Sequence, residues 1–137
     1  MLRNVSRAVS ASLLAIIVFI VLPRTSAEEN PFSSVHVASN WGRYAGNCPV
    51  DLVFTGTINL RAHPNGLVFN YYWLRSDGSK SPIRVVRPGF RQRSVVIHER
   101  WRLGGAGSRY RASMRLFVNS GNTHVEDSSP TVQVICR

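Results

Sequence analysis

The sequence predicts an all-β protein, a sandwich of two antiparallel sheets built from seven strands. Three observations support this fold class. Apolar and polar residues alternate with a period of two in several segments. Turn residues separate these segments at short, regular spacings. After residue 27, no segment has the period of an amphipathic helix. Because each sheet must bury one apolar face, two sheets packed against each other are expected.

The N-terminus has the pattern of an export signal. Arg3 and Arg7 precede an apolar run from Leu13 to Leu22, and the small residues Thr25, Ser26 and Ala27 follow. We therefore predict a signal peptide over residues 1–27 and a single domain over residues 28–137. The run is shorter than the roughly 20 residues of a transmembrane helix, so we expect no membrane span in the mature chain, although an uncleaved anchor is the alternative. The predicted location is extracellular, or periplasmic in a Gram-negative bacterium.

The first half of the domain predicts three strands. A weak leading strand lies near residues 34–39, and a strong one follows over residues 50–60, where Gly56 suggests a bulge. The Asn65-Gly66 pair then predicts the tight turn of a hairpin. The next strand, residues 67–75, is apolar on both faces, as expected for a central strand. Its predicted inward residues include Tyr71 and Trp73.

The second half predicts four more strands, over residues 83–86, 93–103, 109–118 and 131–136. In the second of these, Val95, Ile97 and Trp101 point inward and Glu99 is a misfit on the same side. The third alternates most regularly. The predicted inward residues of the last two strands are Tyr110, Ala112, Met114, Leu116, Val118, Val132, Val134 and Cys136.

Cys48 and Cys136 are the only cysteines in the chain. Export to an oxidising compartment favours a disulfide between them, which would close almost the whole domain. A redox or metal-binding pair is the alternative. No Cys-x-x-Cys spacing supports that alternative.

Several of these residues together resemble a short immunoglobulin-like or fibronectin-III-like module of secreted bacterial proteins. The resemblance implies sheets of strand order A-B-E and G-F-C-C′, with a disulfide from the start of strand B to the end of strand G. It implies no chemistry, because such modules share no catalytic set. The residues that carry it are Cys48-Pro49, Phe54-Thr55-Gly56 with Ile58, Tyr71, Trp73, Ser76-Asp77-Gly78, Ser81-Pro82, Trp101, Leu103-Gly104, Gly107 and Cys136.

No pattern of catalytic residues is visible. The chain lacks the Gly-x-Ser-x-Gly and His-Glu-x-x-His motifs, and its four histidines have no metal or triad spacing. His124, Glu126 and Asp127 come nearest to a cation site, although loop polarity explains them equally well. We therefore predict a protein that is not an enzyme and has neither a cofactor nor a metal.

The charge of the chain is strongly positive. Removing Arg3, Arg7 and Arg24 from 17 basic residues leaves 14 against 7 acidic residues, a net charge of +7 for residues 28–137. Such an excess favours adhesion to a polyanion such as acidic glycan, phosphorylated lipid or nucleic acid. An ordinary solvated basic surface is the alternative. Nothing indicates specific recognition of nucleic acid.

The outward positions of the G-F-C sheet predict a binding surface. Arginine and aromatic side chains are enriched at interface hot spots, so we expect these positions to recognise an unidentified protein or cell-surface ligand. Alternatively, the arginines simply cover the rings and keep the sheet soluble. The candidate residues are Tyr72, Leu74, Arg109, Arg111, Arg115 and Phe117, with Ile135 beside them.

Three functions therefore remain open. The leading one is a noncatalytic secreted binding module, and the first alternative is a basic polyanion-binding protein. The second alternative is a secreted protease inhibitor, since sandwiches of this kind can present inhibitory loops. Its support is limited to the loop of residues 104–108 and the Arg87-Pro88-Gly89 segment.

Overall fold

A computed structural model describes residues 29–61 and 66–137, which form ten strands and no helix. The predicted signal peptide, residues 1–27, lies outside the described residues, as does most of the predicted turn before Gly66. Within the described part of the chain, no helix is long and apolar enough to cross a membrane. The all-β prediction is therefore confirmed for the part of the chain that the structure describes.

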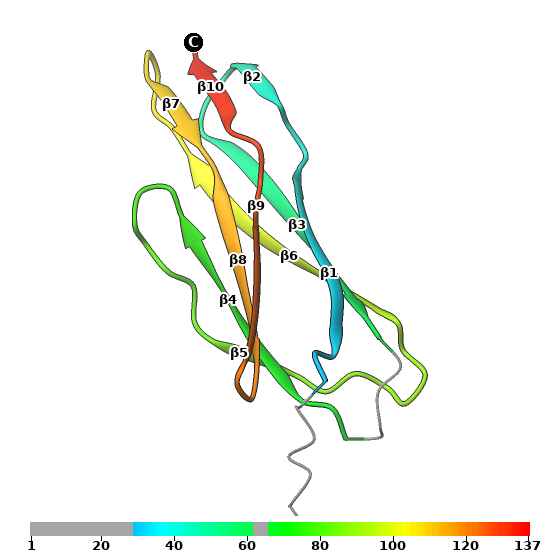
Figure 1. Cartoon of the computed structure of the whole chain (residues 1–137). Helices are drawn as coiled ribbons and strands as arrows, with labels where there is room; N and C mark the ends of the chain where they lie inside the picture. The colour runs from blue at the N-terminus through cyan, green and yellow to red at the C-terminus, as the bar shows by residue number, and fades with distance from the viewer. Residues whose placement is uncertain (1–28, 62–65) are drawn as a thin grey trace, which may run out of the picture.

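The strands form three sheets (Figure 1). The first has the order β1-β3-β6, with β1 at Phe32–Ser39, β3 at Val50–Leu60 and β6 at Ser94–Leu103. The second has the order β5-β4-β8-β9, with β5 at Arg84–Val86, β4 at Phe69–Arg75, β8 at Met114–Ser120 and β9 at Thr123–Ser128. The third has the order β2-β10-β7, with β2 at Arg43–Gly46, β10 at Val132–Cys136 and β7 at Arg109–Ala112.

The third sheet continues the second toward the C-terminal end of the molecule. Only Ser113 separates β7 from β8, and residues 129–131 separate β9 from β10. In Figure 1, β7 and β10 lie beyond the ends of β8 and β9. Among the seven strand pairs of the described residues, six are antiparallel, and only β2 and β10 run parallel to each other.

The core lies between the first sheet and the other two, which makes the domain sandwich-like. The predicted inward residues of β4, β6, β8 and β10 are buried, and Trp73 is fully buried. Gly56 of β3 lies against the opposite layer, where an added Cβ would come within 2.6 Å of Leu116 and 3.1 Å of Trp73. Burial on one face of each sheet is the main stabilising contribution to such a domain.

The prediction of a bulge at Gly56 was wrong. The register between β3 and β6 continues without a shift through Gly56, which lies opposite Ile97. Glycine is needed at this position for space, because a side chain would overlap Leu116 and the Trp73 ring. A glycine inside a strand can mark close packing as well as a bulge.

The predicted hairpin after β3 was also wrong. β3 pairs with β1 and β6, whereas β4 pairs with β5 and β8, so the chain crosses from one layer to the other between them. An Asn-Gly pair predicts a local reversal but does not say whether the next strand pairs with the previous one.

Residues 29–61 and 66–137 form ten strands where we predicted seven in the domain. Two short or polar strands, β2 and β9, were missed, and the strand expected over residues 109–118 divides at Ser113. At that break, Ser76 N donates to Ser113 O at 2.9 Å and Ser113 N donates to Ser76 Oγ at 3.1 Å. The turn after β4 thereby satisfies the backbone N–H and C=O groups of Ser113, which a neighbouring strand would otherwise pair with.

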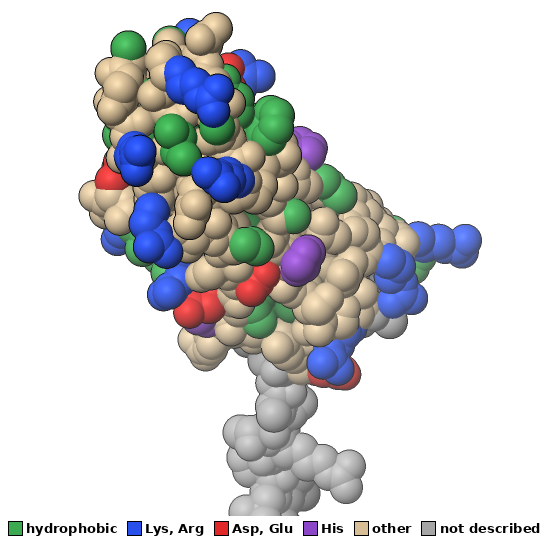
Figure 2. All heavy atoms as spheres, turned by 90° about the horizontal axis from the view of Figure 1, so that it is seen from above, with side chains coloured by type: hydrophobic (Ala, Val, Ile, Leu, Met, Phe, Trp, Pro, Cys, Tyr) green, Lys and Arg blue, Asp and Glu red, His purple; other side chains and the backbone are tan. Residues whose placement is uncertain are grey.

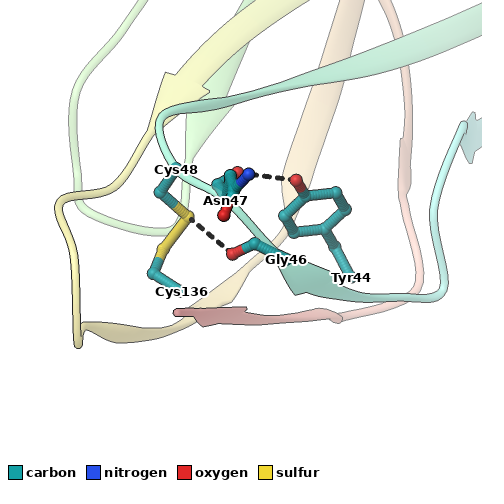
Figure 3. Close-up of a disulfide and its surroundings, with 5 residues drawn as sticks. All are labelled: Tyr44, Gly46, Asn47, Cys48 and Cys136. Carbon is teal, nitrogen blue, oxygen red and sulfur yellow. Dashed lines mark hydrogen bonds between the residues drawn. A yellow bond between two sulfur atoms is a disulfide. The ribbon is translucent and has the colours of Figure 1, made fainter.

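The predicted disulfide joins Cys48, just before β3, to Cys136, the last residue of β10 (Figure 3). The two Cα atoms are 5.4 Å apart. Gly104 packs directly on the bridge with φ +112°, and an added Cβ would lie 2.8 Å from Cys136 Sγ. Nearby, the Tyr44 hydroxyl donates to Asn47 O at 2.6 Å, which fixes the chain before Cys48.

Glu99, the misfit of the predicted inward face, is paired with two arginines from the opposite layer. Its carboxylate lies 3.5 Å from Arg75 Nη2 and 3.3 Å from Arg84 Nη1 and is 12% exposed. Arg75 also lies over the Trp101 ring at 5.5 Å. The pKa of Arg84 is raised, chiefly by a hydrogen bond with Tyr71 and further by Glu99, against an opposing effect of desolvation.

Candidate binding surface

Four of the six predicted binding residues meet on the outer face of the second sheet. In the register of β4 and β8, Tyr72 lies opposite Phe117 and Leu74 lies opposite Arg115. Residues directly opposite each other in an antiparallel pair project from the same face. The four side chains therefore form one patch, called here the aromatic patch.

The rings of the aromatic patch are stacked on each other. Tyr72 and Phe117 have centroids 4.8 Å apart and an interplanar angle of 8°. Lys80 Nζ lies 5.7 Å from the Tyr72 centroid, and the Arg115 guanidinium lies 5.9 Å from that of Phe117. His124 adds a tilted contact to Phe117 at 5.7 Å. The ring faces are thus in contact with groups of the same molecule, while both side chains remain partly exposed.

The charges of the aromatic patch are largely matched. Arg115 Nη1 lies 3.9 Å from Glu126 Oε1, and Arg115 Nε donates to Ser128 Oγ at 3.0 Å. The other carboxylate oxygen of Glu126 lies 3.0 Å from His124 Nε2, while His124 Nδ1 lies 2.7 Å from Asn119 Oδ1. Because all these groups are partly exposed, the ion pair of Arg115 with Glu126 contributes little to stability.

Arg109 and Arg111, the other two predicted residues, lie on β7 in the third sheet. Gln133 of β10 lies between Arg111 and Arg43, since it is opposite both, and Ile135 lies opposite Arg109. A shallow depression of about 370 Å³ is lined by Arg109, Arg111, Gln133 and Ile135. We call these residues with Arg43 the arginine patch.

The arginine patch lacks local acidic partners. No ion pair within residues 29–61 and 66–137 involves Arg43, Arg109 or Arg111, and all three are exposed. Sequence reasoning missed Arg43 because β2 was not predicted. It missed Lys80 because the bridge from Lys80 to Leu74 follows a turn whose direction the sequence does not reveal.

His124, Glu126 and Asp127, the nearest candidates for a cation site in the sequence, do not point to one place in the structure. His124 and Glu126 bond to each other on the outer face. Asp127 instead accepts a hydrogen bond from Val37 N at 2.7 Å and lies 3.7 Å from His36 Nδ1, so it ties β9 to β1. In the described part of the chain, no group of three or more His, Cys, Asp or Glu residues could hold a metal ion.

Basic side chains are spread over several separate places on the face seen in Figure 2, with hydrophobic side chains between them.

No protein-family model matches the sequence, and neither the curated proteins nor the solved structures contain a significant match.

Proposed function

We propose that this protein is an exported, noncatalytic binding module with an immunoglobulin-like sandwich. In this assignment, β1, β3 and β6 are strands A, B and E, β5 and β4 are C′ and C, β8 with its continuation β7 is F, and β9 with its continuation β10 is G. The strand orders and a disulfide from before β3 to the end of β10 support it. The proposed binding surface is the aromatic patch together with Arg109 and Arg111, and the proposed ligand is a protein or another surface component.

The observation that carries this proposal is the prior ordering of the aromatic patch. Tyr72 and Phe117 are held by their mutual stacking and by flanking cations while remaining partly exposed. Side chains that are already fixed lose less conformational entropy when they bind. Because the ring faces are occupied, edge contacts with a protein surface fit better than stacking of a base or a sugar ring.

A second candidate function is polyanion binding, and the arginine patch favours it. Arg43, Arg109 and Arg111 project from neighbouring strands with no described acidic partner. Arginine binds carboxylate, sulfate and phosphate groups through paired N–H donors. Such binding would weaken steeply with salt.

Capture of a partner from extracellular material would distinguish the two functions. Replacing Tyr72 and Phe117 by Ser should lower capture by a protein-binding surface at least tenfold, because hot-spot losses are about 2 kcal/mol each. For a polyanion binder, Arg109→Gln with Arg111→Gln should instead lower retention on heparin and its salt dependence. Both should be measured at two salt concentrations.

Arg100 and Arg102 provide a matched control. Their replacement by Gln also removes two positive charges. These residues, however, lie on β6 in the first sheet, where the Nη1 atoms of Arg100 and Arg102 are 4.0 and 3.8 Å from the Asp51 carboxylate. If the control lowers capture as much as either test variant, binding is a property of net charge and both proposed surfaces are rejected.

A further inference from the structure

The connection between β5 and β6 presents an apolar side chain in a basic setting. Phe90 is 60% exposed, and Arg87, Arg91 and Arg93 around it are also exposed. Large exposed aromatics on a small domain are candidates for contact with a partner or a membrane. Neither the aromatic patch nor the arginine patch includes this segment.

The Phe90 segment is an ordered turn. Gln92 N donates to Gly89 O at 3.0 Å, and Gly89 N donates to Gln92 Oε1 at 2.9 Å. Gln92 Nε2 also donates to Ser94 O at 3.0 Å, which anchors the turn to the start of β6. Phe90 and Arg91 therefore occupy the two central positions of a closed turn, where Phe90 is held away from the core.

This turn lies at the end of the domain where the N-terminal segment joins. Leu60 N donates to Arg93 O at 2.8 Å, and Arg61 N donates to Pro31 O at 2.8 Å, so three distant parts of the chain meet here. Figure 1 shows this end opposite the C-terminus. The apolar run ends at Leu22 and β1 begins at Phe32. Ten residues span at most about 35 Å, so an apolar run held in a bilayer would keep the start of β1 within that distance of it.

The electrostatics of this end suit an anionic surface. Arg61, Arg87, Arg91 and Arg93 are exposed and make no ion pair with another described residue. Glu29 is the described acidic residue closest in sequence to the start of β1, and it too makes no described ion pair with them. By contrast, every arginine on a described strand of the first two sheets has a carboxylate oxygen within 4.0 Å; these are Arg75, Arg84, Arg100, Arg102 and Arg115.

We propose that this end of the domain binds the surface of an anionic phospholipid bilayer. Phe90 enters the headgroup region, and Arg61, Arg87, Arg91 and Arg93 contact lipid phosphates. A bilayer is favoured over a soluble polyanion because it offers an apolar layer for Phe90 beside the negative charges. The proposal does not depend on the aromatic patch or the arginine patch.

Vesicle sedimentation tests the charge component. Purified protein should sediment with vesicles that contain phosphatidylglycerol and phosphatidylcholine, and not with phosphatidylcholine alone. Arg91→Gln with Arg93→Gln should lower binding about 25-fold, since each basic residue near an anionic surface contributes about fivefold. Phe90→Ser should lower it several-fold. Arg100→Gln with Arg102→Gln, which makes the same change in net charge, should lower it no more than about twofold, because the field of distant charges is screened.

A fluorescence experiment tests insertion at the residue itself. Phe90→Trp in vesicles with brominated acyl chains should show quenching beyond that of the native protein, whereas Val96→Trp should not. Val96 is a matched control because it is 54% exposed and lies on β6. This measurement reports on position 90 even if the N-terminal apolar run also contacts the lipid.

Three results would overturn the proposal. The first is the absence of additional quenching in Phe90→Trp. The second is an equal loss of vesicle binding in the two double-arginine variants, which would indicate a diffuse charge effect. The third is heparin binding that needs Arg91 and Arg93 but not Phe90, with no binding to anionic vesicles, which would assign this end to a soluble polyanion.

Discussion

The two ends of the domain differ in how the chain is held there. At the C-terminal end, a disulfide, the pairing of β2 with β10 and the close packing of Gly104 fix three segments together. At the opposite end, backbone hydrogen bonds hold the segments and leave Phe90 and four arginines exposed. The disulfide and the tight packing of Gly104 are therefore at one end and the exposed Phe90 is at the other, so substitutions of these residues should affect different measurements.

The largest effect is expected in the core that joins the two ends. Trp73→Ala should lower the free energy of unfolding by about 3 to 5 kcal/mol or prevent folding, because it removes a fully buried indole between the layers. Chemical denaturation followed by fluorescence and circular dichroism measures this. Trp41→Ala, at a tryptophan that is 41% exposed, is the control and should cost less than about 1 kcal/mol. Similar losses for both would show that Trp73 does not anchor the core.

Breaking the disulfide should have the next largest effect. Cys48→Ser or Cys136→Ser should lower stability by about 2 to 5 kcal/mol, because the bridge closes a large loop and restricts the unfolded chain. Mass spectrometry with and without reduction should find no free thiol in the native protein. Two thiols that react without denaturant would contradict the bridge.

Two glycines of one loop allow the stability effect of packing on the disulfide to be measured apart from that of the backbone conformation. Gly104→Ala should cost about 2 to 4 kcal/mol, since it combines a positive φ of +112° with a Cβ that overlaps both cysteines. Gly107→Ala has a positive φ of +77° and no atom within 4 Å, so about 1 to 2 kcal/mol is expected. Thermal unfolding measures both changes. Equal losses would mean that contact with the bridge adds nothing.

The smallest effect on stability is expected at the exposed end. Phe90→Ser should change the free energy of unfolding by less than about 0.5 kcal/mol, because its side chain is largely solvated. Denaturant titration beside native protein is sufficient. A loss above about 1 kcal/mol would indicate that Phe90 supports the fold rather than a surface contact.

Much of the fold followed from the two-residue period. The inward register of Tyr71, Trp73, Leu116 and Val134 was predicted correctly because each lies on a strand with one continuous apolar face. The missed strands lack that signal. β9 reads Thr-His-Val-Glu-Asp-Ser and forms through pairing with β8, while β2 has four residues and forms beside β10. Tertiary pairing, rather than local propensity, decides such segments.

The candidate surface was predictable in part. Alternation placed Tyr72, Arg109, Arg111 and Phe117 on outward positions. It did not predict that Tyr72 faces Phe117, because that contact depends on the register between β4 and β8. The role of Glu99 also required long-range contacts, since its partner Arg75 lies on another strand.

The position of the disulfide has a mechanical consequence. If tension were applied between the start of β1 and the C-terminus, the load would pass from Cys48 through the bridge to Cys136. The chain between the two cysteines, which are 88 residues apart in the sequence, would then bear none of the force. Extension would be limited to the chain before Cys48, where residues 32–47 could lengthen to about 55 Å. The strands after Cys48, with the aromatic patch and the Phe90 turn, would stay folded under tension until the bridge is reduced, whereas β2 and Arg43 of the arginine patch would be pulled away.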